Sequence, residues 1–98
     1  LEIRGFEGLP EGPATGRIVV SLAVDDRWGV REVRFFVDDE PVNTERSYHY
    51  YLGGDANGVP TGFDTTKLTP GEHTLRAEVV SVSGALSEAR MNFTVAAR

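Results

Sequence analysis

Cysteine is missing from this chain, and lysine, histidine and long apolar runs are scarce. Without cysteine the chain can form neither a disulfide nor a thiolate metal site. A domain of this size needs no crosslink in any compartment, so the missing cysteines do not indicate where the protein resides. Lys67 is the only lysine, and the nine arginines are spread along the sequence. Because the formal net charge is −5 and nucleic acids attract a basic face, we expect no nucleic-acid partner.

Membrane insertion is not expected either, because no apolar run approaches the roughly 20 residues that cross a bilayer. We read no signal peptide in the sequence, and Leu1 is interpreted as the start of a module excised from a longer protein. The 98 residues correspond to a single domain over residues 1–98. Within it, residues 1–13 are expected to form a short edge strand near 1–4 and then a linker, because Pro10 and Pro13 cannot donate to a sheet.

Apolar and polar residues alternate through much of the chain, which is the period of a half-buried β-strand. The pattern predicts strands over residues 16–24, 30–37, 42–45, 47–52, 73–82 and 86–96, with turns at 25–29, 38–41 and 83–84 and an irregular Gly-rich loop at 53–60. The side chains expected in the core are Ile18, Val20, Leu22, Val24, Val33, Phe35, Val37, Tyr48, Tyr50, Leu52, Leu75, Ala77, Val79, Ala89, Met91, Phe93 and Val95. About seven short strands without a helical period favour an all-β antiparallel sandwich.

The segment 62–75 predicts the corner at which the chain passes from one sheet to the other. Leu68 is expected to point inward. Pro70 presets φ for the second position of a type II turn, and Gly71 accepts the positive φ that the third position needs. His73 begins the next strand, at a place where related sandwiches use a tyrosine to hydrogen-bond back across the corner. We therefore expect one ring nitrogen of His73 to brace this corner.

Three segments in this order resemble bacterial immunoglobulin-like modules of secreted and cell-surface proteins. Residues 14–20 resemble the opening strand of those modules, residues 28–39 their Gly-Val strand and hairpin, and residues 52–75 their Asp-Thr-Thr and Gly-x-His-Thr corner. The sequence departs from the pattern at Asp39, where glycine is common, so that turn is expected to be of another type, and at Trp28, where a smaller residue is common. The resemblance implies an immunoglobulin-like or fibronectin III-like β-sandwich, a secreted or cell-surface location, and an accessory role beside other domains.

No catalytic constellation is expected. Asp25 and Asp26, and likewise Asp38 and Asp39, are adjacent pairs in turns, where aspartate is favoured because it hydrogen-bonds its own backbone. The sequence has no Gly-x-Ser-x-Gly motif, and its two histidines lack the spacing of metal ligands. We predict that the chain is not an enzyme and carries no cofactor.

Two weak calcium candidates remain. Asp55 and Asn57 match the first half of an oxygen-ligand loop, but the later ligands of an EF-hand are missing. Asp25 and Asp26 are a second candidate, at a junction with a neighbouring module. Any tight turn would select the same residue types, so the structural interpretation competes with calcium at both places.

Exposed aromatic rings are the strongest functional lead. Phe36 and Tyr51 are expected to face away from the core, and Trp28 lies in a loop, so these three residues are the candidate platform for a polysaccharide. The alternatives are that Trp28 covers the open end of the core, and that Phe36 packs under the Gly-rich loop. Isolated exposed apolar residues are common.

The leading hypothesis is a non-catalytic accessory module that spaces, orients or stabilises neighbouring domains of the same polypeptide, in a larger secreted or surface bacterial protein such as a carbohydrate-active enzyme or an adhesin. The alternatives are a carbohydrate-binding module, with polysaccharide as its partner, and an adhesive or calcium-stiffened module.

Overall fold

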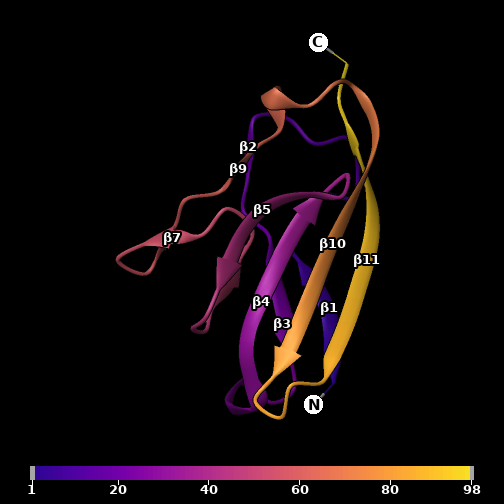
Figure 1. Ribbon diagram of the computed structural model, residues 1–98. Helices are drawn as coiled ribbons and strands as arrows, with labels where there is room; N and C mark the ends of the chain where they lie inside the picture. Colours follow the sequence, from indigo (N-terminus) through magenta and orange to yellow (C-terminus); the bar gives the residue numbers. More distant parts are fainter. Residues whose placement is uncertain (1, 98) are drawn as a thin grey trace.

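Two antiparallel sheets face each other in the computed structural model, which describes residues 2–97. One sheet has the order β1 (Ile3–Glu7), β3 (Ser21–Val24), β6 (Tyr50–Tyr51), and the other has the order β11 (Leu86–Val95), β10 (Gly71–Ser81), β4 (Val30–Val37), β5 (Glu40–Glu45). Figure 1 shows β1 starting at one end of the long axis and β11 finishing at the other. The predicted all-β sandwich is confirmed.

The long strands of the four-stranded sheet follow the predicted alternation. Ala77 on β10 lies opposite Phe35 on β4 and Ala89 on β11, and the inward residues of β4 and β10 are almost fully buried. The core joins both sheets and consists of Val20, Leu22, Val30, Val33, Phe35, Val37, Tyr50, Leu52, Leu75, Ala77, Val79, Phe93 and Val95. Among the partly buried residues packed against it are Ile18, Val24, Leu68 and Ala89.

The strand predicted over residues 16–24 is interrupted. β2 (Arg17–Ile18) pairs with β9 (Phe63–Asp64), and β3 begins only at Ser21. Val19, between them, is half exposed, and the backbone of Gly8 passes so close that a Cβ there would lie 2.1 Å from the Val19 carbonyl oxygen. The backbone of the opening segment therefore lies directly against the chain at the break. The first expected strand is β1, and its expected start at Leu1 lies outside the described residues.

Two core assignments are wrong. Met91 is 49% exposed, and it lines a groove between β11 and residues 9–13 of the opening segment. Tyr48 is 45% exposed because the strand expected over residues 47–52 is reduced to β6. The alternation of apolar and polar residues includes both positions, but no strand of the facing sheet packs over either side chain.

The Gly-rich loop is more regular than predicted. Residues 55–60 form a small hairpin of β7 (Asp55–Ala56) and β8 (Val59–Pro60), which projects from the sandwich in Figure 1. Its turn residues Asn57 and Gly58 have φ of 54° and 81°, the left-handed values of a type I′ hairpin. The Asn-Gly pair is a hairpin signal that our sequence interpretation passed over.

The turn between β4 and β5 is shorter than predicted. Asp38 and Asp39 have φ of 51° and 65°, as a two-residue type I′ turn requires, so β5 already begins at Glu40. The expectation that Asp39 changes the turn type agrees with this geometry. The carboxylate of Asp38 accepts a hydrogen bond from the Thr74 N–H at 3.0 Å, which ties the turn to β10.

The predicted corner is present. Asp64 caps the short 3-10 helix η2 (Thr65–Lys67), and Gly71 has the expected positive φ of 113°. Nε2 of His73 lies 2.6 Å from the Thr69 carbonyl oxygen, which confirms the bracing role. Nδ1 of His73 lies 2.5 Å from Oδ2 of Asp38, a second partner that the sequence did not predict.

Candidate functional site

Trp28 stands out of the loop between β3 and β4. The loop contains the 3-10 helix η1 (Arg27–Gly29), closed by a hydrogen bond from the Gly29 N–H to the Asp26 carbonyl. The indole is 80% exposed, the largest exposure among the large apolar side chains of residues 2–97. The alternative in which Trp28 covers the open end of the core is therefore wrong.

Tyr48 and Arg27 lie beside this indole. The guanidinium carbon of Arg27 is 4.9 Å from the centre of the Trp28 ring and 4.8 Å from the centre of the Tyr48 ring. Such cation–π contacts hold a guanidinium against aromatic faces. We call these three side chains the Trp28–Tyr48 platform.

The platform is anchored to the core by Tyr50. Its buried ring meets the Tyr48 ring edge-on, with centres 5.7 Å apart, and its hydroxyl donates to the Arg27 carbonyl at 3.4 Å. Burial raises the pKa of the Tyr50 phenol, so the neutral, donating form is favoured. One buried residue thus positions both the loop and the exposed tyrosine.

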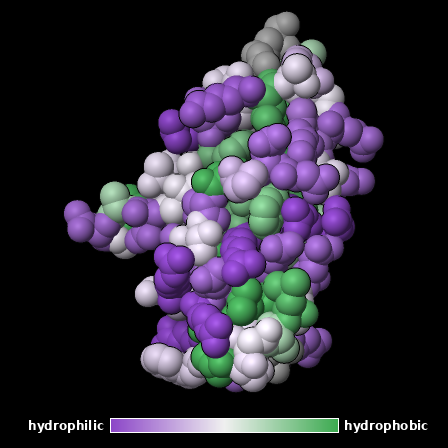
Figure 2. Space-filling view, viewed as in Figure 1, coloured by the Kyte–Doolittle hydropathy of each residue, from purple (hydrophilic) through white to green (hydrophobic). Residues whose placement is uncertain are grey.

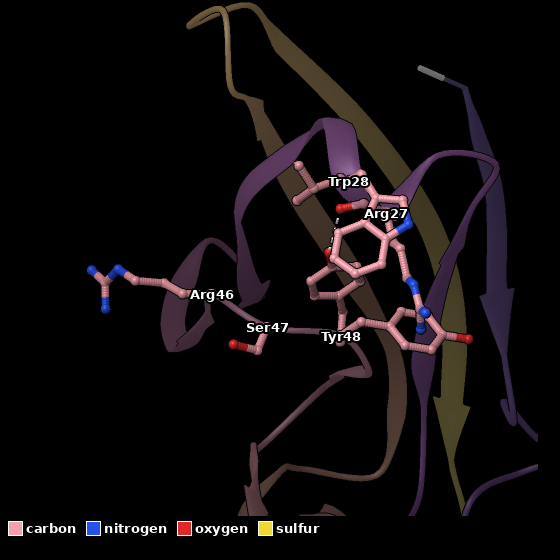
Figure 3. Close-up of a pocket in the computed structure, with 7 residues that line it drawn as sticks. Arg27, Trp28, Arg46, Ser47 and Tyr48 are labelled. Atoms are coloured by element: carbon pink, nitrogen blue, oxygen red, sulfur yellow. Dashed lines mark hydrogen bonds between the residues drawn. The ribbon is translucent and has the colours of Figure 1, made fainter.

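A groove lies on each side of the platform. One has a volume of about 350 Å³ and the other about 320 Å³. Figure 3 shows the first groove, with Trp28 and Tyr48 close to Arg27 and with the Arg46 side chain pointing away from them. The first is lined by Arg27, Trp28, Val30, Arg46, Ser47, Tyr48 and Tyr50, and the second by Val24, Asp25, Asp26, Arg27, Trp28 and Tyr48.

The structure does not bring Trp28, Phe36 and Tyr51 together. Phe36 faces outward on β4, but the Arg76 guanidinium carbon lies 3.9 Å from its ring centre. Tyr51, on β6, is only partly exposed and stacks with His49, 5.8 Å away. Of the three candidates, only Trp28 lies in the platform.

Sequence reasoning missed the two companions of Trp28. Tyr48 was assigned to the core because it has the same phase as Tyr50 and Leu52, and no residue in 46–48 marks the late start of the strand. Arg27 could be recognised only from its position next to Trp28 in a loop, which is a weak signal.

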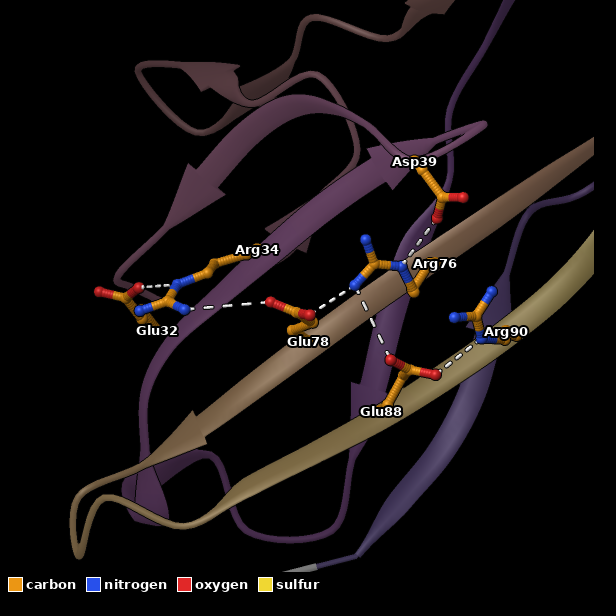
Figure 4. A network of polar contacts seen from close by, with 7 residues as sticks. All are labelled: Glu32, Arg34, Asp39, Arg76, Glu78, Glu88 and Arg90. Atoms are coloured by element: carbon orange, nitrogen blue, oxygen red, sulfur yellow. Dashed lines mark hydrogen bonds and ion pairs between the residues drawn. The ribbon is translucent and has the colours of Figure 1, made fainter.

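The outer face of the four-stranded sheet carries paired charges. Figure 4 shows the network on β4, β10 and β11, in which Arg76 occupies the centre. Arg76 donates to Glu78, and its other nearby acids are Asp39 at 3.4 Å and Glu88 at 3.7 Å. The Asp39 contact is an ion pair without hydrogen-bond geometry, since Arg76 Nε has no hydrogen-bond partner within residues 2–97.

Further ion pairs extend this network along the sheet: Arg34 with Glu32 at 2.5 Å and with Glu78 at 3.9 Å, Arg46 with Glu32 at 3.6 Å, and Arg90 with Glu88 at 2.7 Å. The hydrogen bond from Arg34 lowers the pKa of Glu32, so this carboxylate is held in its charged form. Figure 2 shows a face covered mainly by hydrophilic side chains, with apolar groups at the end that holds the β10–β11 turn and smaller apolar areas along the middle.

One carboxylate of each calcium candidate pair accepts a backbone hydrogen bond. Asp55 accepts a hydrogen bond from the Gly58 N–H at 3.0 Å, and Asp25 accepts one from the Glu2 N–H at 2.6 Å. Across the described residues, no group of three or more histidine, aspartate or glutamate side chains is placed to hold a metal. Calcium at Asp55 and Asn57, or at Asp25 and Asp26, remains an untested prediction.

Comparison with known proteins shows the fold. No protein-family model and no curated protein matches this sequence. Among solved structures, the chain is similar to the fibronectin(III)-like modules of Clostridium thermocellum CbhA, with 20% identity, a TM-score of 0.62, and coverage of 97% of this chain and 93% of that one.

It is also similar to the Clostridium perfringens spore cortex lytic enzyme SleM, with 13% identity and a TM-score of 0.62 over 98% of this chain but only 28% of that one. No helix within residues 2–97 is long and apolar enough to span a membrane. Together with the sheet order, these likenesses show that the chain has the immunoglobulin-like, fibronectin III-like β-sandwich fold.

Proposed function

We propose that this chain is a non-catalytic accessory module of a larger secreted or cell-surface bacterial protein, in which it spaces, orients or stabilises neighbouring domains. The observation that carries the proposal is the pattern of coverage: the chain matches nearly the whole of a fibronectin(III)-like module and only 28% of the SleM chain. In both cases the sandwich is one part of a longer polypeptide or of a set of modules.

The geometry of the sandwich supports a spacing role. The molecule measures 44 × 27 × 22 Å, and β1 begins at the opposite end of the long axis from the last residues of β11. A module that receives the chain at one end and releases it at the other adds its long dimension to the distance between its neighbours. Its antiparallel sheets share one core, so this distance is set by a rigid body.

The charged residues also fit a passive role. The acids of the outer sheet face contact arginines, and Asp38, Asp55 and Asp64 hydrogen-bond backbone N–H groups in turns. These side chains have structural partners that account for their positions. We therefore assign no catalytic residue.

The test uses the longer polypeptide that contains this chain. The module would be replaced once by a flexible Gly/Ser linker of equal residue number and once by an unrelated rigid β-sandwich of similar length. Small-angle scattering and thermal unfolding of the flanking domains would be measured.

We expect the flexible linker to broaden the interdomain distance distribution, or to lower the melting temperature of a flanking domain, and the rigid sandwich to restore the distance. Unchanged distances and stability with the flexible linker would contradict the proposal. So would hydrolysis or modification of a substrate by the 98-residue chain alone.

A further inference from the structure

We propose that the Trp28–Tyr48 platform is a binding site for a neutral polysaccharide. The inference goes beyond the spacing role and does not depend on it, because it rests on the two grooves and their side chains. It also replaces the grouping of Trp28 with Phe36 and Tyr51 that the sequence predicted. The site consists of Trp28, Tyr48 and Arg27, flanked by Asp25 and Asp26 in one groove and by Ser47 in the other.

The first argument is the exposure of two large rings side by side. Trp28 is 80% exposed and Tyr48 is 45% exposed; Arg27 lies over each of the two rings, and the His49 ring packs against Tyr48 with centres 3.8 Å apart. Apolar surface of this kind is unfavourable in water and is stabilised by a flat, weakly polar partner. The C–H face of a pyranose ring is such a partner, and its hydroxyl groups remain at the rim to reach polar side chains.

The second argument is that the rings are held before any ligand arrives. Tyr50 packs edge-on against Tyr48, and its hydroxyl donates to the carbonyl of Arg27. The Arg27 guanidinium then lies against both exposed rings. A ring already fixed in position loses little conformational entropy on binding, which favours a weak ligand such as a sugar chain.

The third argument concerns charge. Asp25 and Asp26 line one groove, Arg46 lines the other, and Arg27 lines both. An acidic polysaccharide would be repelled by the aspartates and by the net charge of −5. Hydroxyl groups can both donate to carboxylates and accept from guanidinium groups, so a neutral sugar chain satisfies both flanks.

A protein partner fits the grooves less well. Aspartate and serine are depleted at protein interfaces, whereas Asp25 and Asp26 line one groove and Ser47 lines the other. Val82, an exposed apolar residue, is at the same end of the sandwich, because its N–H donates to the Gly29 carbonyl. It lines neither groove, which makes Val82→Ala a matched control.

The experiment uses the fact that Trp28 is the only tryptophan of the chain. Its fluorescence and its quenching by acrylamide would be followed while the 98-residue chain is titrated with mixed-linkage β-glucan, xyloglucan and galactomannan. Polygalacturonate serves as the acidic control polymer. Retention in gels that contain each polymer gives a second readout, which is needed for variants that lack the indole.

We expect a neutral polysaccharide to protect Trp28 from acrylamide and to retard the chain, and polygalacturonate to have no such effect. Trp28→Ala should weaken retention at least about tenfold, Tyr48→Ala should weaken it several-fold, and Val82→Ala should leave it unchanged. Trp28→Phe should keep part of the binding. Unchanged melting temperatures would show that the variants fold.

Four outcomes would overturn the proposal: no protection by any of the neutral polymers, equal retention by polygalacturonate, retention that survives Trp28→Ala and Tyr48→Ala, or an equal loss with Val82→Ala. Protection of Trp28 that grows with protein concentration in the absence of sugar would identify a contact between copies instead. None of these results would affect the spacing role, which the linker replacement tests separately.

Discussion

His73 offers the sharpest test of how this fold is held together. Its Nδ1 lies 2.5 Å from the Asp38 carboxylate and its Nε2 lies 2.6 Å from the Thr69 carbonyl oxygen. A carboxylate and a carbonyl oxygen both accept hydrogen bonds, so both ring nitrogens must carry a proton for the two bonds to form. The imidazolium of His73 therefore connects the β4–β5 turn with the corner before β10.

The size of the effect follows from burial. The His73 side chain is only 8% exposed, whereas its partner Asp38 is 43% exposed and can be rehydrated when the imidazole is lost. Discounting for that exposure, we expect His73→Ala to lower the free energy of unfolding by about 2 kcal/mol. In a domain of this size the melting temperature would fall by roughly 10 °C.

The pH dependence has a defined sign. The hydrogen bond to Asp38 raises the pKa of His73, so its stabilisation is complete below the unfolded value of about 6.5 and is lost as the pH rises through the folded pKa. Desolvation acts to raise the pKa of Asp38, but the bonds from His73 and the Thr74 N–H outweigh it and lower the pKa. The stabilisation that the Asp38 carboxylate contributes is present above about pH 3.9 and is lost as the pH falls through its folded pKa.

Thermal unfolding of the wild type and His73→Ala between pH 4 and 9 would measure this effect. We expect the difference in melting temperature to be largest between about pH 4 and 6.5 and to shrink at higher pH. Asp38→Asn keeps a residue that tolerates the positive φ but removes the charge, so it should weaken the same pH dependence. The control is His49→Ala, which removes an exposed imidazole. A difference between wild type and His73→Ala that is constant across this range would refute the reasoning.

Five other substitutions, two matched pairs and one single change, test the packing by their effect on the free energy of unfolding. Gly53→Ala should cost about 3 kcal/mol, since its Cβ would lie 2.4 Å from a backbone carbonyl oxygen. Gly58→Ala is the matched comparison: its φ is also positive, but its Cβ would lie in open space, so the cost should be about 1 kcal/mol. Leu75→Ala should cost about 3 kcal/mol because the site is fully buried, and Met91→Ala about 0.5 kcal/mol. Arg76→Ala should cost about 2 kcal/mol, because it uncovers an aromatic ring and removes the hydrogen bond that the largely buried Glu78 accepts from it. Equal losses within the glycine pair or within the Leu75 and Met91 pair, or no loss at Arg76, would contradict these expectations.

The long strands could be predicted because their two faces have different environments. Val33, Phe35, Leu75 and Val79 alternate with outward side chains, several of them charged, and the register between β4 and β10 places the four inward residues against the opposite sheet. Alternation fails where the opposite sheet ends. Met91 has the phase of a core residue, but the opening segment, not a strand, lies beside it, and no pattern within β11 contains that information.

Backbone conformation explains the remaining differences. The Asn-Gly hairpin at residues 55–60 was readable from a two-residue signal that alternation does not capture. The break at Val19 was not, because it lies where the backbone of Gly8, just after the end of β1, packs against the chain. Local sequence patterns therefore predict turns and long strands, whereas contacts between separate segments can be seen only in the tertiary structure.

The candidate site could likewise be predicted only in part from the sequence. Exposure of Trp28 follows from its place in a loop, but its pairing with Tyr48 depends on β6 starting only at Tyr50. Tyr50 serves the core with its ring and the loop with its hydroxyl, so one buried residue fixes the geometry of rings that do not contribute to the core. Loss of Trp28 or Tyr48 should then be felt by a ligand and hardly by the fold, whereas loss of Tyr50 should be felt by both.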